Sequence, residues 1–220
     1  MAHERNRLGV LVLLAGLLPA GCGPQGGAML YYLGAGDRQK TAAQFTLGKG
    51  PILVLVDDLG ERVIWPEIRE RLAGRLADDL LAHKATEKVI SAQTLQLARR
   101  TQPDFDKRGC REVGRLMGAD QVLWVEVADF FASEALEDVD SATRIAVTIK
   151  VVDPKGTVKD GNIRVWPVER EGRPVKVELS ANDVNRARTR QAIAEELTSR
   201  LAVEIARLFY EHPLDDLVKS

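Results

Sequence analysis

The feature that most constrains the fold is a continuous apolar run, Ile52–Val56, bounded by Gly50-Pro51 and by Asp57-Asp58. Such a short run, rich in aliphatic residues, predicts a strand that is covered on both of its faces. The segment that follows, from Pro66 to about His83, has apolar residues at every fourth position and predicts a helix. A doubly covered strand with a helix after it predicts an α/β fold.

The remaining elements follow from the same kinds of pattern. Residues 88–90 predict a second strand, and Pro103-Asp104 begins a helix that Gly118 ends. Strands are expected over residues 121–131, 144–152 and 163–168, and residues 173–179 allow a further short strand. Asn182 or Asp183 is expected to cap a closing helix that runs to about Tyr210. We therefore predict one α/β (α+β) domain with a mixed sheet, the order β-α-β-α-β-β-β-α, and a long C-terminal helix.

Two of the expected strands carry candidate binding residues. Within residues 144–152 the apolar and polar positions alternate, which predicts one buried face and one wetter face. In the strand over residues 121–131, Glu126 and Asp129 are expected on opposite faces. Most aromatic side chains of these strands belong in the core. Trp166, which precedes Pro167 at a predicted sheet edge, and Trp124 are the candidate partner-binding residues, through strand addition or a small apolar patch.

The N-terminus has the organisation of an export signal. Arg5 and Arg7 precede an apolar stretch, Leu8–Leu18, which is too short for a comfortable transmembrane helix. The sequence Leu18-Pro-Ala-Gly-Cys22 follows and resembles a lipobox, although the pattern prefers Leu at the position of the proline. We therefore predict a signal peptide over residues 1–21, cleavage between Gly21 and Cys22, and lipid attachment at Cys22. A cleaved signal with an incidental cysteine and an uncleaved anchor are the alternatives.

Acyl chains on Cys22 would hold the rest of the chain at a membrane. Each buried methylene contributes about 0.8 kcal/mol, so several chains on one residue make detachment negligible. The expected location is the periplasmic side of the cell membrane or outer membrane, and Gly23 after the cysteine favours the outer membrane. Residues 22–49 are expected to form a spacer, residues 50–212 the folded domain and residues 213–220 a tail.

The charge balance excludes one class of partner. The chain has 31 basic and 32 acidic residues, and without residues 1–21 these numbers become 29 and 31. The resulting net charge of −2 does not indicate a basic surface for nucleic acid, nor a polybasic arm that would bind lipids. We therefore expect no nucleic-acid partner.

Residues that would mark an enzyme are poorly placed. No serine lies in a Gly-x-Ser-x-Gly elbow, and the histidines lie in the signal, at a predicted helix end and near the C-terminus. No metal-ligand or phosphate-loop spacing is found. The best-placed carboxylates are those of Asp57 and Asp58, because ligands of α/β sheets gather at the carboxyl ends of strands. Cys110 has basic neighbours, and it is either a buried side chain or a reactive thiol.

The order of elements resembles the periplasmic α/β domain that the CsgG, LpoB and TolB N-terminal families of envelope proteins share. The residues that carry the resemblance are the lipobox at Cys22, the strand Ile52–Val56 with its helix, and the segment Gly118-Ala-Asp-Gln-Val-Leu-Trp-Val-Glu-Val127. The resemblance covers about residues 51–210. It implies a non-enzymatic role, such as docking to a cell-wall synthase or a secretion assembly. The loops, including Ser133–Asp140, are too short and acidic for the membrane hairpins of CsgG-like pores, and the spacer is shorter than the stalk of LpoB-like activators.

Together these patterns predict a lipid-anchored periplasmic protein, with no metal and no cofactor, that binds another envelope protein or further copies of itself. The alternative is a tethered solute-binding protein or hydrolase with a carboxylate pocket near Asp57 and Asp58. A deep cleft with close, buried carboxylates would favour the alternative. Exposed aromatic side chains beside an edge strand would favour protein binding.

Overall fold

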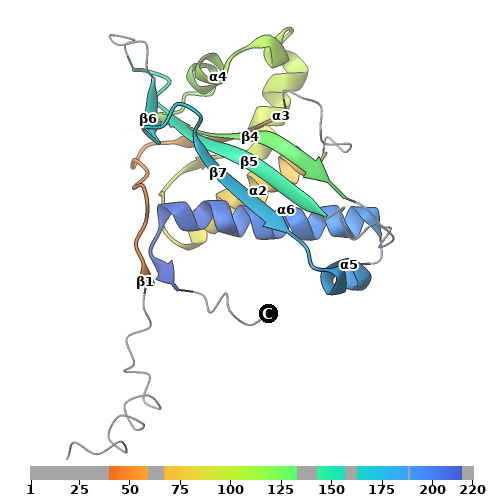
Figure 1. The fold of residues 1–220 in the computed structure, drawn as a ribbon. Helices are drawn as coiled ribbons and strands as arrows, with labels where there is room; N and C mark the ends of the chain where they lie inside the picture. Colours follow the sequence, from red (N-terminus) through yellow and green to blue (C-terminus); the bar gives the residue numbers. More distant parts are fainter. Residues whose placement is uncertain (1–39, 59–66, 133–142, 157–162, 188, 215–220) are drawn as a thin grey trace, which may run out of the picture. The chain divides into compact units, whose positions relative to one another are not determined.

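A computed structural model describes residues 40–58, 67–132, 143–156, 163–187 and 189–214 of the chain. One compact unit of the chain is Ala42–His212, and the described residues Lys40, Thr41, Pro213 and Leu214 belong to a second unit. The short strands β1 (Lys40–Thr41) and β8 (His212–Pro213) lie near the ends of the described chain. All other elements belong to the unit Ala42–His212 (Figure 1). Gly21, Cys22 and the predicted signal peptide lie outside the described residues.

A six-stranded mixed sheet forms the middle of the unit (Figure 1). Its strands are β2 (Ile52–Asp57), β3 (Val89–Ile90), β4 (Gln121–Phe131), β5 (Arg144–Val152), β6 (Arg164–Trp166) and β7 (Arg173–Glu178). β2 pairs in parallel with β3 on one side and with β4 on the other. β4 pairs in antiparallel with β5, and β5 pairs in antiparallel with both β6 and β7. The sheet therefore ends at β3 on one edge and at β6 and β7 on the other.

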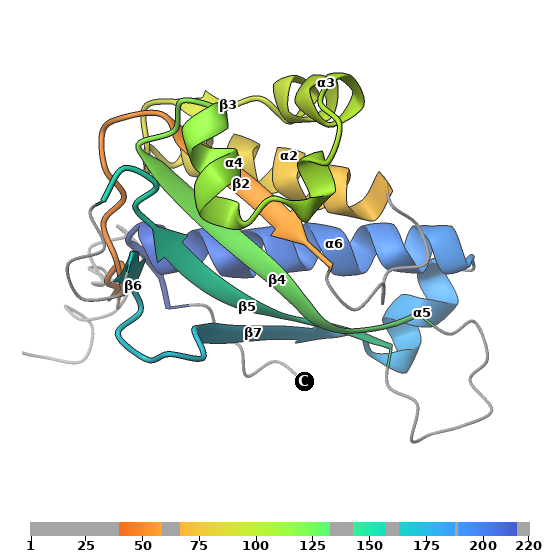
Figure 2. The same ribbon diagram turned by 90° about the horizontal axis from the view of Figure 1, so that it is seen from above.

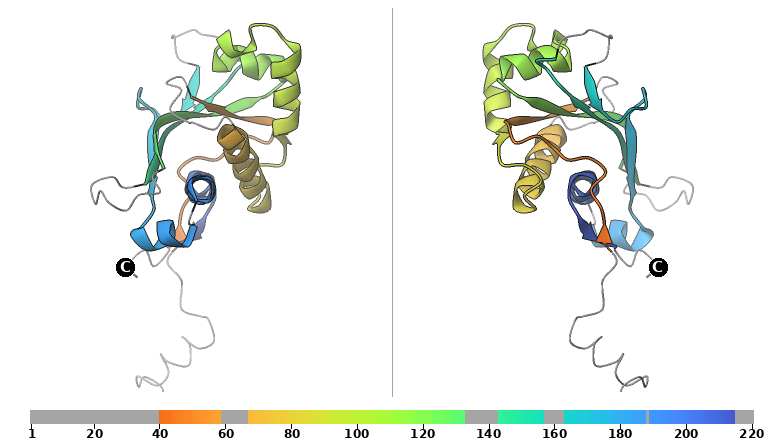
Figure 3. Two further views of the ribbon diagram at one scale, coloured as in Figure 1. Left: turned by 90° about the vertical axis from the view of Figure 1, so that its right-hand side faces the viewer. Right: turned by 90° about the vertical axis from the view of Figure 1, so that its left-hand side faces the viewer.

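Helices cover the two faces of this sheet unequally. They are α2 (Glu67–Ala82), α3 (Ala92–Thr101), α4 (Cys110–Leu116), α5 (Ala181–Ala187) and α6 (Arg190–Ala206), with 3₁₀ turns at Phe105–Lys107 and Arg207–Phe209. α2 and α6 pack on one face, which we call the inner face, and the sheet curves around them (Figure 3). α3 and α4 pack on the other, outer face, over β2 and the start of β4 (Figure 2).

The inner face contains the larger apolar core. The apolar residues of α2 that recur every fourth position are buried there, and Leu76 has 0% of its surface exposed. Ile149 of β5 and Leu201 of α6 are also at 0% exposure in the same core. The burial of β5 alternates along the strand as predicted, because its odd-numbered residues from 145 to 151 face this core. Burial of these aliphatic side chains is the main stabilising contribution to the fold.

The outer face has a second, smaller core beneath α3 and α4. Leu53, Val113 and Val122 are among its buried residues. Gly114 lets α4 approach the sheet closely, because a Cβ atom at this position would overlap the side chains of Val122 and Pro154. α4 therefore lies against the first residues of β4. On the same side of the sheet, no described helix covers β5 and β7 (Figure 3).

The predicted fold class is confirmed: the chain is a mixed α/β protein with a mixed sheet and a long helix near its C-terminus. Three helical segments differ from the prediction. The helix expected from Pro103-Asp104 to Gly118 begins only at Cys110 as α4, because Asp104 has a left-handed backbone (φ 62°) and starts a separate 3₁₀ turn. α3 was not predicted, although the side chain of Ser91 caps it by accepting a hydrogen bond from the backbone N–H of Thr94. The predicted closing helix is two helices, because Thr189 is extended and caps α6 by accepting from the N–H of Ala192 at 3.1 Å.

One prediction about the faces of β4 was wrong. Glu126 and Asp129 lie on the same face, because a β-bulge between Val127 and Asp129 shifts the register of the strand. Glu126 is opposite Thr148 on β5, and Asp129 is opposite Ala146. Thr148 and Ala146 are two residues apart and therefore share a face, so the two carboxylates opposite them do too. Both carboxylates belong to the outer face.

Among the described residues, none of the helices has the length and apolar character needed to cross a membrane.

Candidate functional site

The outer face has a part that helices leave open, which we call the open face. It consists of the outward residues of three strands: Trp124, Glu126, Asp129 and Phe131 of β4; Arg144, Ala146, Thr148 and Lys150 of β5; and Pro174, Lys176 and Glu178 of β7. Alternation along the strands places these residues outward, and the bulge in β4 brings Asp129 into line with them. We treat the open face as the candidate site, because charged and aromatic side chains are ordered there on a rigid sheet.

At one end of the open face, a lysine lies between an indole ring and a carboxylate. Lys150 Nζ is 4.7 Å from the ring centroid of Trp124, its direct cross-strand partner. The same ammonium donates to Glu126 Oε2 at 3.2 Å. The side chain of Lys150 is only 16% exposed, so its charge depends on these partners. The indole Nε1–H of Trp124 is buried and has no hydrogen-bond partner in the described part of the chain.

At the other end, beyond the bulge, the same combination of a cation, an aromatic ring and a carboxylate recurs. The guanidinium of Arg144 lies over the ring of Phe131, its cross-strand partner, at 5.9 Å from the centroid. Arg144 Nε donates to Asp129 Oδ2 at 2.6 Å. On β7, Lys176 and Glu178 form a further ion pair. The described cations of the open face are thus each paired with a carboxylate, and Phe131 remains 39% exposed at its end.

The two tryptophans that the sequence singled out have different surroundings. Trp124 is half-buried on the open face. Trp166 instead points toward the inner core, where its ring lies 5.8 Å from the ring of Phe45 and 5.7 Å from that of Phe209. Its edge strand β6 is only three residues long and is followed by Pro167. Of the two residues, Trp124 is the one on a surface that a partner could approach.

The carboxylates named for the alternative function lie at the end of β2. Asp57 is the register neighbour of Glu126 across the parallel pair β2–β4, so both carboxylates face the outer side. Asp58 is only 8% exposed and has an interaction partner. The segment that follows, residues 59–66, is outside the described residues. The structure therefore brings Asp57 beside the open face rather than into an enclosed pocket with Asp58.

Cys110 begins α4 and is half-buried. Burial raises the pKa of its thiol above the ordinary value of 9.0, and the negative charge of Asp57 raises it further, whereas the backbone N–H of Arg111 and the charge of Lys150 lower it. The burial effect is the largest, so the thiol stays protonated at neutral pH. A protonated thiol is a poor nucleophile, which favours the unreactive of the two interpretations of this cysteine.

The two histidines of the described chain both contact the ring of one tyrosine. The ring of His83 stacks on that of Tyr210 at 4.1 Å between centroids, and His212 meets the same ring edge-on at 6.0 Å. The hydroxyl of Tyr210 donates to Asp79 Oδ2 at 3.3 Å. Burial and the negative charge of Asp79 raise the pKa of Tyr210 to about 12. The described residues contain no group of three or more His, Cys, Asp or Glu side chains that could hold a metal ion.

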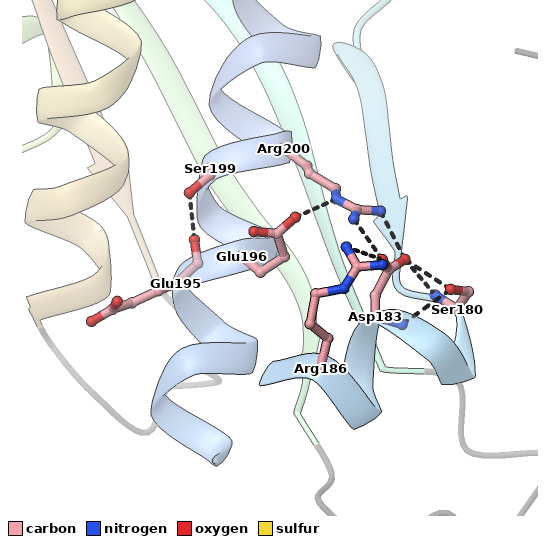
Figure 4. A network of polar contacts seen from close by, with 7 residues as sticks. All are labelled: Ser180, Asp183, Arg186, Glu195, Glu196, Ser199 and Arg200. Atoms are coloured by element: carbon pink, nitrogen blue, oxygen red, sulfur yellow. Dashed lines mark hydrogen bonds and ion pairs between the residues drawn. The ribbon is translucent and has the colours of Figure 1, made fainter. Parts of the chain in front are cut away.

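A polar network joins α5 to α6 on the inner side of the sheet (Figure 4). Arg200 donates to both carboxylate oxygens of Asp183, at 3.0 and 3.1 Å, and to Glu196 Oε1 at 2.7 Å. The hydroxyl of Ser180 donates to Asp183 Oδ2 at 2.8 Å. The hydrogen bonds from Arg200 and Ser180 hold the pKa of Asp183 at about 2, below its ordinary value of 3.8. Each group has a structural partner, so this network positions α5 and offers no free acid or base.

A shallow cavity of about 170 Å³ lies between the N-terminal ends of α2 and α6. Ile68 and Ala194 supply its apolar lining, and the ion pair of Arg71 and Glu195 borders it. These two charged groups are paired with each other across the two helices. Glu67 also borders the cavity but is exposed to solvent, so the lining does not gather polar groups around an enclosed ligand.

Comparisons with known proteins assign neither a family nor a function to this chain. No protein-family model matches the chain, and no curated protein matches it. Among solved structures, the chain is similar to the lipoprotein GNA1162 from Neisseria meningitidis, with a TM-score of 0.43 and 16% identity over 71% of this chain and 98% of that chain.

Two other solved structures are similar to a comparable degree. The PelC dodecamer from Paraburkholderia phytofirmans gives a TM-score of 0.40 and 15% identity over 78% of this chain and 96% of that chain. The hypothetical protein CT253 from Chlamydia trachomatis gives a TM-score of 0.39 and 13% identity over 74% of this chain and 98% of that chain. These scores are low, and no role is drawn from any of the three.

Proposed function

We propose that this protein is a membrane-tethered lipoprotein of the cell envelope that acts by binding other proteins, and that it performs no covalent chemistry. The tether is the lipid predicted on Cys22, and the body is the unit Ala42–His212. We further propose that this body is related to the periplasmic domains of the CsgG, LpoB and TolB N-terminal families. The observation that carries the proposal is the open face, where β4, β5 and β7 present side chains that no described helix covers.

The composition of the open face supports protein binding rather than catalysis. Its cations are paired with carboxylates, so neither sign of charge is free to polarise a substrate. Burying an ion pair at an interface costs less free energy of desolvation than burying an isolated charge. The pairs also fix how two partners align, because their charges must match those of the partner. Phe131, with 39% of its surface exposed, supplies an apolar anchor at one end. An exposed sheet face with paired charges and an apolar anchor fits a protein partner better than a small solute.

Photocrosslinking in intact cells tests the binding surface. A photoreactive amino acid replaces Lys176 or Phe131 on the open face, and, as the matched control, Arg75, an exposed residue of α2. We expect discrete adducts with an envelope protein, or with a second copy of the chain, from the open-face positions and none from the control. Adducts absent from all positions, or equal at all of them, would contradict the proposed surface.

Mass spectrometry of the protein isolated from membranes tests the tether separately. The expected mature polypeptide begins at Cys22 and carries the mass of diacylglycerol and a further acyl chain. Cys22→Ser is the matched variant, and it should leave the signal unprocessed at this position and release no lipidated peptide. A mature chain that begins elsewhere, or at Cys22 without lipid, would overturn this part of the proposal.

The alternative, a solute binder or hydrolase near Asp57, has one observation in its favour. Asp57 and Glu126 are register neighbours on the outer side, and Lys150 pairs with Glu126. Two carboxylates with one ammonium resemble a minimal acid–base group. Screening the purified chain against small-molecule libraries, with the melting temperature as the measurement, distinguishes solute binding from protein binding. A ligand whose stabilisation is abolished by Asp57→Asn would favour the alternative over protein binding.

A further inference from the structure

The layer formed by α3 and α4 carries an excess of positive charge that the whole-chain balance hides. Residues 91–118 contain twice as many basic as acidic side chains. The basic ones are Arg99, Arg100, Lys107, Arg108, Arg111 and Arg115, and the acidic ones are Asp104, Asp106 and Glu112. The mature chain as a whole is slightly acidic, so this layer differs in sign from the average of the molecule.

Some of these cations are neutralised within the layer. Arg99 Nε lies 3.5 Å from Asp106 Oδ1, and Lys107 Nζ lies 2.6 Å from Asp104 Oδ1. Asp104 and Asp106 are thus already in ion pairs, and Glu112 is the one remaining acidic side chain of residues 91–118. The remaining four arginines of the layer therefore face one carboxylate.

Two of the remaining arginines are held together rather than apart. Arg115 Nε donates to the carbonyl oxygen of Pro154 at 2.6 Å, and Arg111 Nε approaches the same oxygen at 3.4 Å. Arg111 also donates to the carbonyl oxygen of Gly156 at 2.5 Å. Carbonyl groups orient a guanidinium but do not cancel its charge. Two like charges converge on one neutral acceptor, which concentrates positive potential beside the turn at residues 153–156.

The acidic groups near this turn are engaged elsewhere. Asp153 Oδ1 accepts from the backbone N–H groups of Lys155 and Gly156, at 2.8 and 2.9 Å. Asp120 is paired with the ammonium of Lys155. Both carboxylates therefore reduce the local positive potential in part, but in the described part of the chain the guanidinium groups of Arg111 and Arg115 bond to carbonyl oxygens rather than to these carboxylates.

The same two helices expose leucine side chains. Leu97 of α3 is 62% exposed, and Leu116 of α4, next to Arg115, is 38% exposed. Solvent-exposed leucines beside arginines are typical of protein surfaces that rest in the headgroup region of a bilayer. The charge attracts the surface to anionic lipids, and the apolar side chains insert at the boundary with the acyl chains.

We infer that the outer side of the α3–α4 layer lies on an anionic lipid surface. This inference rests on the proposed tether, which would keep a bilayer within reach of the body and so raise the effective concentration of headgroups around it. A protein partner with acidic side chains would also pair with the arginines and cover Leu97 and Leu116. The tether favours the lipid surface, because it holds the body beside headgroups whatever the concentration of any partner.

Vesicle flotation tests this contact without the tether. The chain from residue 22 onward with Cys22→Ser, which carries no lipid, is mixed with vesicles of phosphatidylcholine or of phosphatidylcholine with phosphatidylglycerol. We expect it to float with the anionic vesicles only, and to be released as salt is raised. Each basic side chain at the surface should contribute about a fivefold increase in partitioning.

A charge-matched pair of variants locates the contact. Arg100→Gln with Arg108→Gln removes two exposed charges from the layer, and partitioning should fall roughly 25-fold. Arg75→Gln with Arg173→Gln makes the same charge change on α2 and β7 and should leave partitioning within about twofold. Leu97→Ala should also weaken binding to anionic vesicles. Circular dichroism verifies that each variant is folded. If the double variant of Arg100 and Arg108 does not fold, the single variant Arg100→Gln is used in its place.

Three results would overturn the inference. They are no flotation with either kind of vesicle, equal flotation with both kinds, or equal losses in the two double variants. Capture of an acidic protein by the native chain, with no binding to anionic vesicles, would also count against it and in favour of a protein contact. A failure here leaves the tether untouched, because lipid on Cys22 is measured independently by mass spectrometry of the membrane-bound protein.

Discussion

The two faces of the sheet are made by the same strands and held by different forces. On β5, Ile149 faces the inner core at 0% exposure, while its neighbour Lys150 faces outward and is held by Glu126 and the ring of Trp124. The inner face is stabilised by burial of apolar area under α2 and α6. The outer face is organised by cross-strand ion pairs and, at one end, by the α3–α4 layer. Stability therefore depends mainly on one face, and the other is available for contacts with partners.

Adjacent substitutions on β5 test this difference most directly. Ile149→Ala leaves a cavity in the inner core and should reduce the free energy of unfolding by about 4 kcal/mol. Thr148→Ala, one residue away on the outer face, should reduce it by less than about 1 kcal/mol. Urea denaturation followed by circular dichroism measures both. Similar losses for the two variants would mean that the outer face contributes as much stability as the inner one.

The part of the outer face under α4 should behave like a core, unlike the open face. Gly114→Val would place a side chain against Val122 and Pro154, and we expect a loss of about 3 kcal/mol in the free energy of unfolding. Gly74→Ala, on α2, has open space around its Cβ position and should instead stabilise the protein by about 1 kcal/mol. If Gly114→Val is tolerated as well as Gly74→Ala, α4 is not closely packed on the sheet.

Much of the contrast between the faces could be predicted from the sequence. The four-residue period of α2 and the alternation in β5 are physical consequences of helix and strand geometry, and both correctly identified the inner core. The bulge in β4 could not be predicted, because nothing in the sequence between Val127 and Asp129 distinguishes it from a regular strand. As a result, the alignment of Glu126 with Asp129 on one face was missed.

The candidate site shows the same division between local and long-range information. Trp124 was a candidate from its residue type and strand alone, but its partner Lys150 depends on the β4–β5 register. The convergence of Arg111 and Arg115 on Pro154 joins residues about forty positions apart in the chain. Net charge is a sum over the chain and carries no information on such grouping. Arrangements of this kind require the tertiary structure.

The polar network of α5 and α6 adds a pH-dependent element to the inner side. Since the pKa of Asp183 is about 2 in the folded protein and about 3.8 when unfolded, the stabilisation by its charge is complete above about pH 5 and is lost as pH falls toward 2. Asp183→Asn should cost about 1 kcal/mol at neutral pH. The difference between variant and native protein should narrow between pH 4 and pH 2. A difference that stays constant over this range would show that the carboxylate charge is not what stabilises the network.

The ion pairs of the open face should contribute least to stability. Arg144 and Asp129 are 34% and 44% exposed, so a double-mutant cycle with Arg144→Met and Asp129→Asn should give a coupling of about 0.5 kcal/mol that falls as salt is added. The pair of Lys150 and Glu126 is 16% and 30% exposed and less screened, so its coupling should be larger and less sensitive to salt. Equal couplings for the two pairs would mean that the gradient of exposure along the open face has no energetic consequence. The end at Arg144 is thus where charges can exchange partners at the lowest cost, and we expect a binding protein to make its first contacts there.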